Sequence, residues 1–138
     1  MNIIKNLFRY GFHDTTADFI RLRENQVEIF FSNGIYELDY SGREVKLTPK
    51  VEMQIKVDTR FCRLEDMIEV REIFPKYKKI RIHDIEKGSK YRMDINNIYY
   101  SRFNNTILLD CTIGNSDILI SIEECLDIYY AFTFSNED

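Results

Sequence analysis

The chain is poor in the residues that build helices, and it lacks the segments that cross membranes or direct secretion. It contains 2 Ala and 9 Leu, against 19 Ile, 5 Val, 10 Phe and 9 Tyr. Ala and Leu are strong helix formers, whereas β-branched and aromatic side chains favour strands. No run of about eighteen apolar residues occurs, so we expect no membrane partner. The N-terminus lacks the long apolar stretch of a signal peptide, which predicts a cytoplasmic protein.

Motifs that carry chemistry are also missing. The 5 glycines are scattered, which excludes a glycine-rich phosphate loop, and there is no GxSxG nucleophile motif. The 3 cysteines form no CxxC pair, and we expect all of them to be reduced and structural. No spacing typical of a metal site is present. The sequence therefore predicts a protein that is not an enzyme, with no catalytic residues, no metal site and no cofactor.

The two histidines are the only residues that suggest catalysis. His13 and His83 are each followed by an aspartate, and such pairs can act as acid and base or bind a metal. Metal-dependent phosphohydrolases with this signature need further ligands and a larger helical domain. A small nuclease using either histidine stays as an alternative. We interpret each pair as a turn in which the aspartate caps a backbone group.

Charge is unevenly distributed along the chain. The formal net charge is −4, which argues against nucleic acid as a partner. The stretch 76–92 mixes Lys and Arg with two tyrosines, a pattern that can hold single strands, but acids interrupt it and a solvated loop explains it as well. Residues 103–138 contain no Lys or Arg and seven acids. A patch of one sign either steers a partner of opposite charge or keeps the protein soluble.

Alternation of apolar and polar residues predicts short strands through the first half of the chain. Residues 1–10 have the spacing of one or two helical turns. Glu24-Asn25 and Asn33-Gly34 are expected to be turns, and the second is a strong hairpin signal that pairs the strands on either side of it. Pro49 ends the stretch that includes residues 43–47. The predicted strands are 19–23, 27–31, 35–40, 43–47 and 51–57.

The second half continues the pattern, with two ambiguous segments. Residues 63–74 fit a helix or a strand, and we favour a strand that stops at Pro75. Ser121-x-x-Glu124 could start a helix, but we favour a bend followed by a strand, because Leu126, Ile128, Tyr130, Phe132 and Phe134 alternate with other residues. Asn104-Asn105 closes a predicted hairpin. The remaining predicted strands are 80–82, 93–103, 107–113 and 118–122.

These elements predict a single mainly-β domain over residues 1–138, with α+β and one short helix as a variant. About 8–10 short strands with a turn every eight to twelve residues suggest an antiparallel sandwich or a strongly bent sheet.

Two segments resemble a known class of proteins. The first is Gly11-Phe12-His13-Asp14-Thr15-Thr16 leading into Ala17-Asp18-Phe19-Ile20, and the second is Tyr99 to Leu109. Their pattern of turns and alternation, over about residues 7–57 and 97–134, resembles small immunity proteins of bacterial polymorphic toxin systems, including contact-dependent growth inhibition. The resemblance implies a cytosolic protein that binds a cognate toxin domain, in many cases a basic nuclease, and blocks it.

No partner-contacting residue follows from the resemblance, so we select candidates on physical grounds. Acidic side chains steer a basic partner, and tyrosines are good interface anchors. The alternative for each tyrosine is packing in the core, and the alternative for the whole protein is a structural domain that forms a homodimer through a sheet edge. The candidate partner-binding residues are Asp117, Glu123, Glu124, Asp127, Tyr99, Tyr100 and Tyr129.

Overall fold

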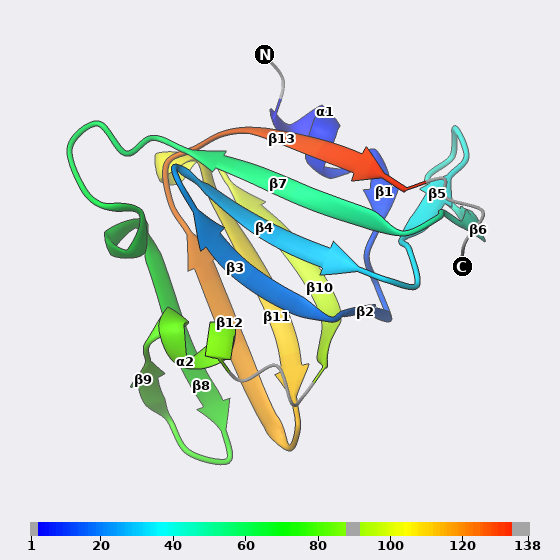
Figure 1. The fold of residues 1–138 in the computed structure, drawn as a ribbon. Coiled ribbons are helices and arrows are strands. Elements are labelled where there is room, and N and C mark those ends of the chain that lie inside the picture. The colour runs from blue at the N-terminus through cyan, green and yellow to red at the C-terminus, as the bar shows by residue number, and fades with distance from the viewer. Residues whose placement is uncertain (1–2, 88–91, 134–138) are drawn as a thin grey trace.

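The computed structural model describes residues 3–87 and 92–133. Strands account for 57% of the chain and helical turns for 13%, so the prediction of a mainly-β protein is confirmed. The 13 strands of the described part form three antiparallel sheets. A four-stranded sheet lies across a six-stranded one, and the two diverge at one end (Figure 1).

The four-stranded sheet has the order β13-β7-β4-β3. Its strands are β3 (Phe19–Arg23), β4 (Gln26–Phe31), β7 (Val51–Val57) and β13 (Cys125–Phe132). Burial alternates strictly along β7, where the four odd-numbered residues are buried and those between them are half-buried. This is the pattern of a strand with one face on the core and the other toward solvent.

The six-stranded sheet has the order β2-β10-β11-β12-β8-β9. It consists of β2 (Thr15–Ala17), β8 (Ile68–Phe74), β9 (Lys78–Ile80), β10 (Met93–Ser101), β11 (Thr106–Ile113) and β12 (Ser116–Ile122). Strand β2 pairs only with Met93–Ile95 of the nine-residue β10. The rest of β10 therefore has no neighbouring strand on that side within the described chain.

A smaller sheet and four short helical elements complete the fold. The sheet has the order β1-β5-β6 and lies beside the end of β13 (Figure 1). Its strands are β1 (Tyr10–Gly11), β5 (Tyr36–Leu38) and β6 (Glu44–Leu47), and the helices are α1 (Ile3–Leu7), η1 (Leu64–Met67), α2 (Ile82–Lys87) and η2 (Phe103–Asn105). None of the described helices is long and apolar enough to cross a bilayer.

The core lies between the inner faces of the two large sheets. Phe31, Met53 and Ile55 from one sheet and Leu109 and Ile120 from the other are at most 1% exposed. Burying side chains of this size contributes about 1.5–3 kcal/mol each relative to solvent exposure. Helix α1 packs against β13, and the Tyr130 hydroxyl donates to the Asn6 carbonyl over 2.9 Å.

The chain passes between the two large sheets three times. Ala17 ends β2 in the six-stranded sheet, and Phe19 begins β3 in the four-stranded one. The segment after β7 returns the chain through η1 to β8. The last crossing is a sharp corner at Glu124, which has a φ of 53° and separates β12 from β13. The expected bend followed by a strand is confirmed there.

The predicted hairpin at Asn33-Gly34 is wrong. A turn does form, since the Gly34 N–H donates to the Phe31 carbonyl, but β4 pairs with β3 and β7, whereas β5 pairs with β1 and β6. Gly34 has a φ of 79°, and a Cβ there would lie 2.1 Å from the Thr48 carbonyl oxygen. The glycine therefore directs the chain out of the four-stranded sheet, past Thr48, into the small sheet.

Other local predictions are corrected in part. Residues 63–74 contain the favoured strand, but only from Ile68, because Leu64–Met67 form a 3-10 turn. The strand predicted at 80–82 is wrong beyond Ile80, since Ile82 begins α2. Leu126 is 54% exposed, because a bulge in β13 interrupts the alternation before Ile128. Phe134 lies outside the described residues.

The outer face of the four-stranded sheet carries a buried carboxylate. Glu28 of β4 is only 1% exposed although it points away from the core. It accepts a hydrogen bond from Arg21 Nε at 2.5 Å and another from the Gln26 amide. Burial alone would raise the Glu28 pKa, but the bonds from Arg21 and Gln26 outweigh it and hold the pKa below its ordinary value of 4.5.

Candidate functional site

An uncovered acidic surface lies on the outer side of β10, β11 and β12. Asp94 of β10 and Asp117 of β12 are both exposed and lie opposite Thr112 of β11, whose hydroxyl is 3.4 Å from an Asp117 oxygen. Asp110 lies on the same side and is half-buried. These three strands contain no Lys or Arg. We name this surface, formed by Asp94, Asp110, Asp117, Tyr99, Leu108 and Leu119, the acidic face.

Apolar side chains lie among these acids. Tyr99 is 49% exposed and lies opposite the half-buried Leu108, and Leu119 lies opposite Asp110. The Tyr99 hydroxyl accepts a hydrogen bond from the Asn97 amide over 3.1 Å. A partly apolar centre among like charges has the character of a docking surface, since apolar contacts supply affinity and the charges supply orientation.

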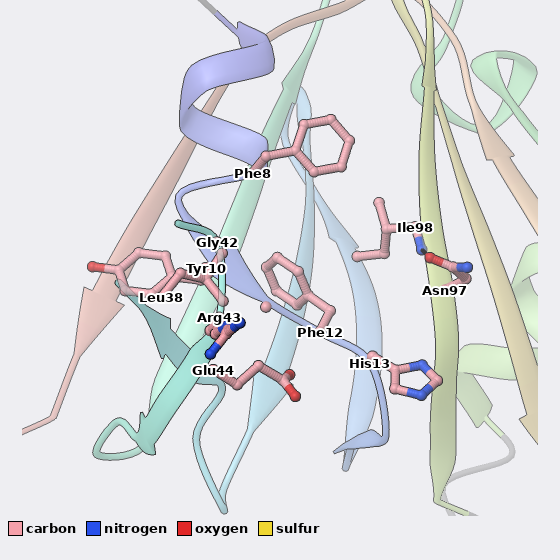
Figure 2. A pocket seen from close by; sticks show the side chains of 11 residues that line it. Phe8, Tyr10, Phe12, His13, Leu38, Gly42, Arg43, Glu44, Asn97 and Ile98 are labelled. Atoms are coloured by element: carbon pink, nitrogen blue, oxygen red, sulfur yellow. Dashed lines mark hydrogen bonds between the residues drawn. The ribbon is translucent and has the colours of Figure 1, made fainter. Parts of the chain in front are cut away.

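A cleft opens beside β10, on the side away from the acidic face. It has a volume of about 680 Å³, within the usual range of about 300–1,000 Å³ for ligand pockets. Figure 2 shows Phe8, Phe12 and Ile98 around its apolar part, with Glu44 and His13 at one margin. Phe8 is 47% exposed, whereas Phe12 is buried and its ring centroid lies 5.8 Å from that of Phe31. We name this space the aromatic cleft.

His13 is held at the margin of the aromatic cleft by two oxygen atoms. Its Nδ1–H donates to the Asn96 carbonyl over 2.8 Å, and its Nε2 lies 3.2 Å from a carboxylate oxygen of Asp14. Both ring nitrogens thus face acceptors, which favours the doubly protonated ring. The Asn96 carbonyl, then Asp14 and then Glu44 raise the His13 pKa above its ordinary value of 6.5.

His83 lies in a different place, on α2. Its Nδ1 is 2.8 Å from Glu86, and its Nε2 is 3.6 Å from Glu65 of η1. The other oxygen of Glu86 accepts the Leu22 N–H of edge strand β3 over 2.8 Å, so α2 links the two sheets at their open side. The structure does not bring the two histidines together, since each lines its own pocket.

No group of three His, Cys, Asp or Glu side chains within residues 3–87 and 92–133 could hold a metal ion. All three cysteines are free, and Cys111 and Cys125 are buried whereas Cys62 is exposed. Burial raises the pKa of both buried thiols to about 12. Neither buried thiol therefore provides a thiolate at neutral pH.

The predicted partner-binding residues separate into four places. Asp117 and Tyr99 share the acidic face. Tyr100 turns to the opposite side of β10, where it is half-buried and its hydroxyl donates to Asn105 over 2.5 Å. Glu123 and Glu124 form the corner after β12, where the Glu124 N–H donates to the Asn104 carbonyl. Both acids at this corner are half-buried.

The last two predicted residues lie on the four-stranded sheet. Asp127 is only 3% exposed and accepts a hydrogen bond from Asn6 over 2.9 Å. It is therefore occupied within the fold, and we do not retain it as a steering charge. Tyr129 is 43% exposed, and the Lys56 ammonium lies 5.6 Å from its ring centroid.

Sequence reasoning missed most residues of these two surfaces, and four of them carry the argument. Asp94 and Asp110 belong to the acidic face, and the strand register that places them beside Asp117 could have been drawn from the alternation around the predicted Asn104-Asn105 hairpin. Phe8 and Glu44 reach the aromatic cleft from α1 and β6. No local pattern predicts that these two distant segments meet.

Comparison of the chain with protein-family models, with curated proteins and with solved structures found no match.

Proposed function

We propose that this chain is an immunity protein that captures and neutralises a basic toxin domain in the cytoplasm. The acidic face carries this proposal, because three adjacent strands present carboxylates and an exposed tyrosine with no basic side chain among them. A basic nuclease domain is complementary to such a face, since the surface that binds nucleic acid must itself be positive.

Complementary charge raises the rate of association, and the apolar side chains of the same face lengthen the life of the complex. Rapid capture suits an inhibitor that must act before a toxin reaches its substrate. A standard interface covers about 800 Å² on each partner, so the contact extends beyond the three strands of the acidic face. The resemblance of residues 7–57 and 97–134 to immunity proteins supports the same function.

The test is to express the chain with the protein encoded by the adjacent gene and to measure association by stopped flow at several salt concentrations. We expect a defined complex, with the neighbouring protein toxic when it is expressed alone. The double variant Asp110→Asn/Asp117→Asn is expected to slow association by about tenfold at low salt and to flatten the salt dependence. The matched control is Glu24→Gln, an exposed acid in the turn between β3 and β4.

An unchanged association rate in the double variant would exclude the acidic face as the steering surface. A chain that binds no neighbouring protein and forms a homodimer would instead favour the self-associating structural domain.

A further inference from the structure

We propose that the aromatic cleft and the adjoining free edge of β10 bind an extended peptide segment as an added strand. The segment pairs with the backbone at Ile98 and Tyr100, places an apolar side chain in the cleft, and offers a Lys or Arg to Glu44. This inference deepens the proposed function, because it assigns a binding mode to part of the captured protein and rests on that function for the identity of the partner.

The backbone of β10 supplies the first part of the argument. Strand β2 covers β10 only as far as Ile95, whose carbonyl accepts the Asp14 N–H over 3.0 Å. A bulge follows, at which the Asn96 carbonyl also turns to this side and meets His13. The Ile98 N–H donates to Oδ1 of the preceding residue, Asn97, over 3.0 Å.

These bonds indicate which residues face the open side. In an antiparallel ladder, alternate residues direct both N–H and C=O away from the paired strand. The Ile98 N–H donates to the Asn97 side chain and not to a carbonyl of β11, so it points away from β11. Ile98 and Tyr100 therefore form that alternate set. No strand of the described chain pairs with them on this side. An unpaired edge of this kind accepts an added strand through main-chain hydrogen bonds.

The cleft supplies the second part. It begins just beyond the pair of Thr15 and Ile95, where β2 starts, since Asn97 and Ile98 belong to both the free edge and the cleft lining. Side chains of an added strand alternate between the two faces of the sheet, so every second one would point toward Phe8 and Phe12. An extended peptide with apolar residues at alternate positions therefore fits both the edge and the cleft.

Glu44 supplies the charge preference. It is exposed, and its charge acts on His13 across the margin of the cleft. Figure 2 shows Glu44 reaching toward the cleft, with Arg43 beside it on the same lining. His13 is already engaged by Asp14 and Asn96. The exposed Glu44 carboxylate is thus complementary to a Lys or Arg of the bound segment.

The experiment uses the full chain and a displayed library of random seven-residue peptides. We expect enriched peptides to alternate large apolar residues with others and to carry a Lys or Arg. Phe8→Ala and Glu44→Gln are each expected to weaken their binding by about tenfold. Val45→Ala is the matched control, because Val45 neighbours Glu44 on β6, is 60% exposed and does not line the cleft.

Hydrogen exchange of the complex tests the strand pairing directly. The Tyr100 amide should become protected when the peptide binds. Failure to enrich any peptide, insensitivity to Phe8→Ala, or an unprotected Tyr100 amide would overturn the inference. Peptides weakened only by Asp110→Asn/Asp117→Asn would overturn it while leaving the proposed function intact. Peptide binding without capture of the neighbouring protein would overturn the proposed function instead.

Discussion

The buried carboxylate of Glu28 allows a quantitative test of how the outer face of the four-stranded sheet is stabilised. We expect Glu28→Gln to destabilise the protein by about 2 kcal/mol, because hydrogen bonds to a charged group contribute about 1.5–3 kcal/mol each. A glutamine at this position keeps one acceptor for Arg21 but turns a donor toward the donating amide of Gln26. One of the two bonds is therefore lost.

The matched control is Glu69→Gln. Like Glu28, Glu69 pairs with an arginine on an outer sheet face. Its partner is Arg71 on the same strand, whose Nη2 lies 2.7 Å from the Glu69 carboxylate. The Glu69 side chain is 49% exposed, against 2% for Glu28. Exposed pairs contribute about 0–1 kcal/mol, so we expect this control to cost less than about 0.5 kcal/mol.

Urea and thermal unfolding would measure both variants. For a chain of this length, about 2 kcal/mol corresponds to a fall in Tm of about 6–8 °C. The low pKa of Glu28 also fixes a pH dependence, since its contribution is present above pH 4.5 and is lost as the pH falls through the folded-state pKa. Equal losses of stability in the two variants would refute the reasoning, because burial would then add nothing to the pair.

Three further predictions concern the folded state. An NMR titration should give His13 a pKa above 6.5, and Asp14→Asn should lower it; any stabilisation from this contact is present below pH 6.5 and lost as the pH rises through the folded-state pKa. A thiol reagent at neutral pH should modify Cys62 rapidly and Cys111 only upon unfolding, because Cys111 is buried with a pKa of about 12; equal reaction rates would contradict the burial. Gly34→Ala should cost at least about 2 kcal/mol in urea unfolding, because Gly34 has a φ of 79° and contacts Thr48; a neutral effect would mean that the turn relaxes freely.

Strands with strict alternation were predictable from the sequence, because alternation is a local consequence of a half-buried sheet. The segments 19–23 and 51–57 match β3 and β7 residue for residue. The pairing of strands was harder to predict from the sequence. Asn33-Gly34 signals a hairpin locally, yet the chain leaves the sheet there because β7 occupies the edge of β4 that the hairpin would use.

The candidate site was predictable only in part. Composition identified an acidic second half, and Asp117 and Tyr99 do lie on one exposed face. Asp127 shows the limit of that reasoning, because a charge in the sequence carries no information about its burial beneath a distant segment. Its contact with Asn6 joins residues 121 positions apart, and only the tertiary fold specifies it.

The three crossings between the sheets also bear on how the protein is made. Helix α1 near the N-terminus packs on β13, the last strand of the described chain. Strand β2 cannot pair until β10 has been synthesised. On a chain that is still emerging from the ribosome, the six-stranded sheet therefore cannot be completed before β12, and the four-stranded sheet cannot be completed before β13. Folding of such non-local pairings is comparatively slow. A nascent chain would thus expose unpaired strands until β13 has been synthesised, which makes that interval the stage most open to aggregation.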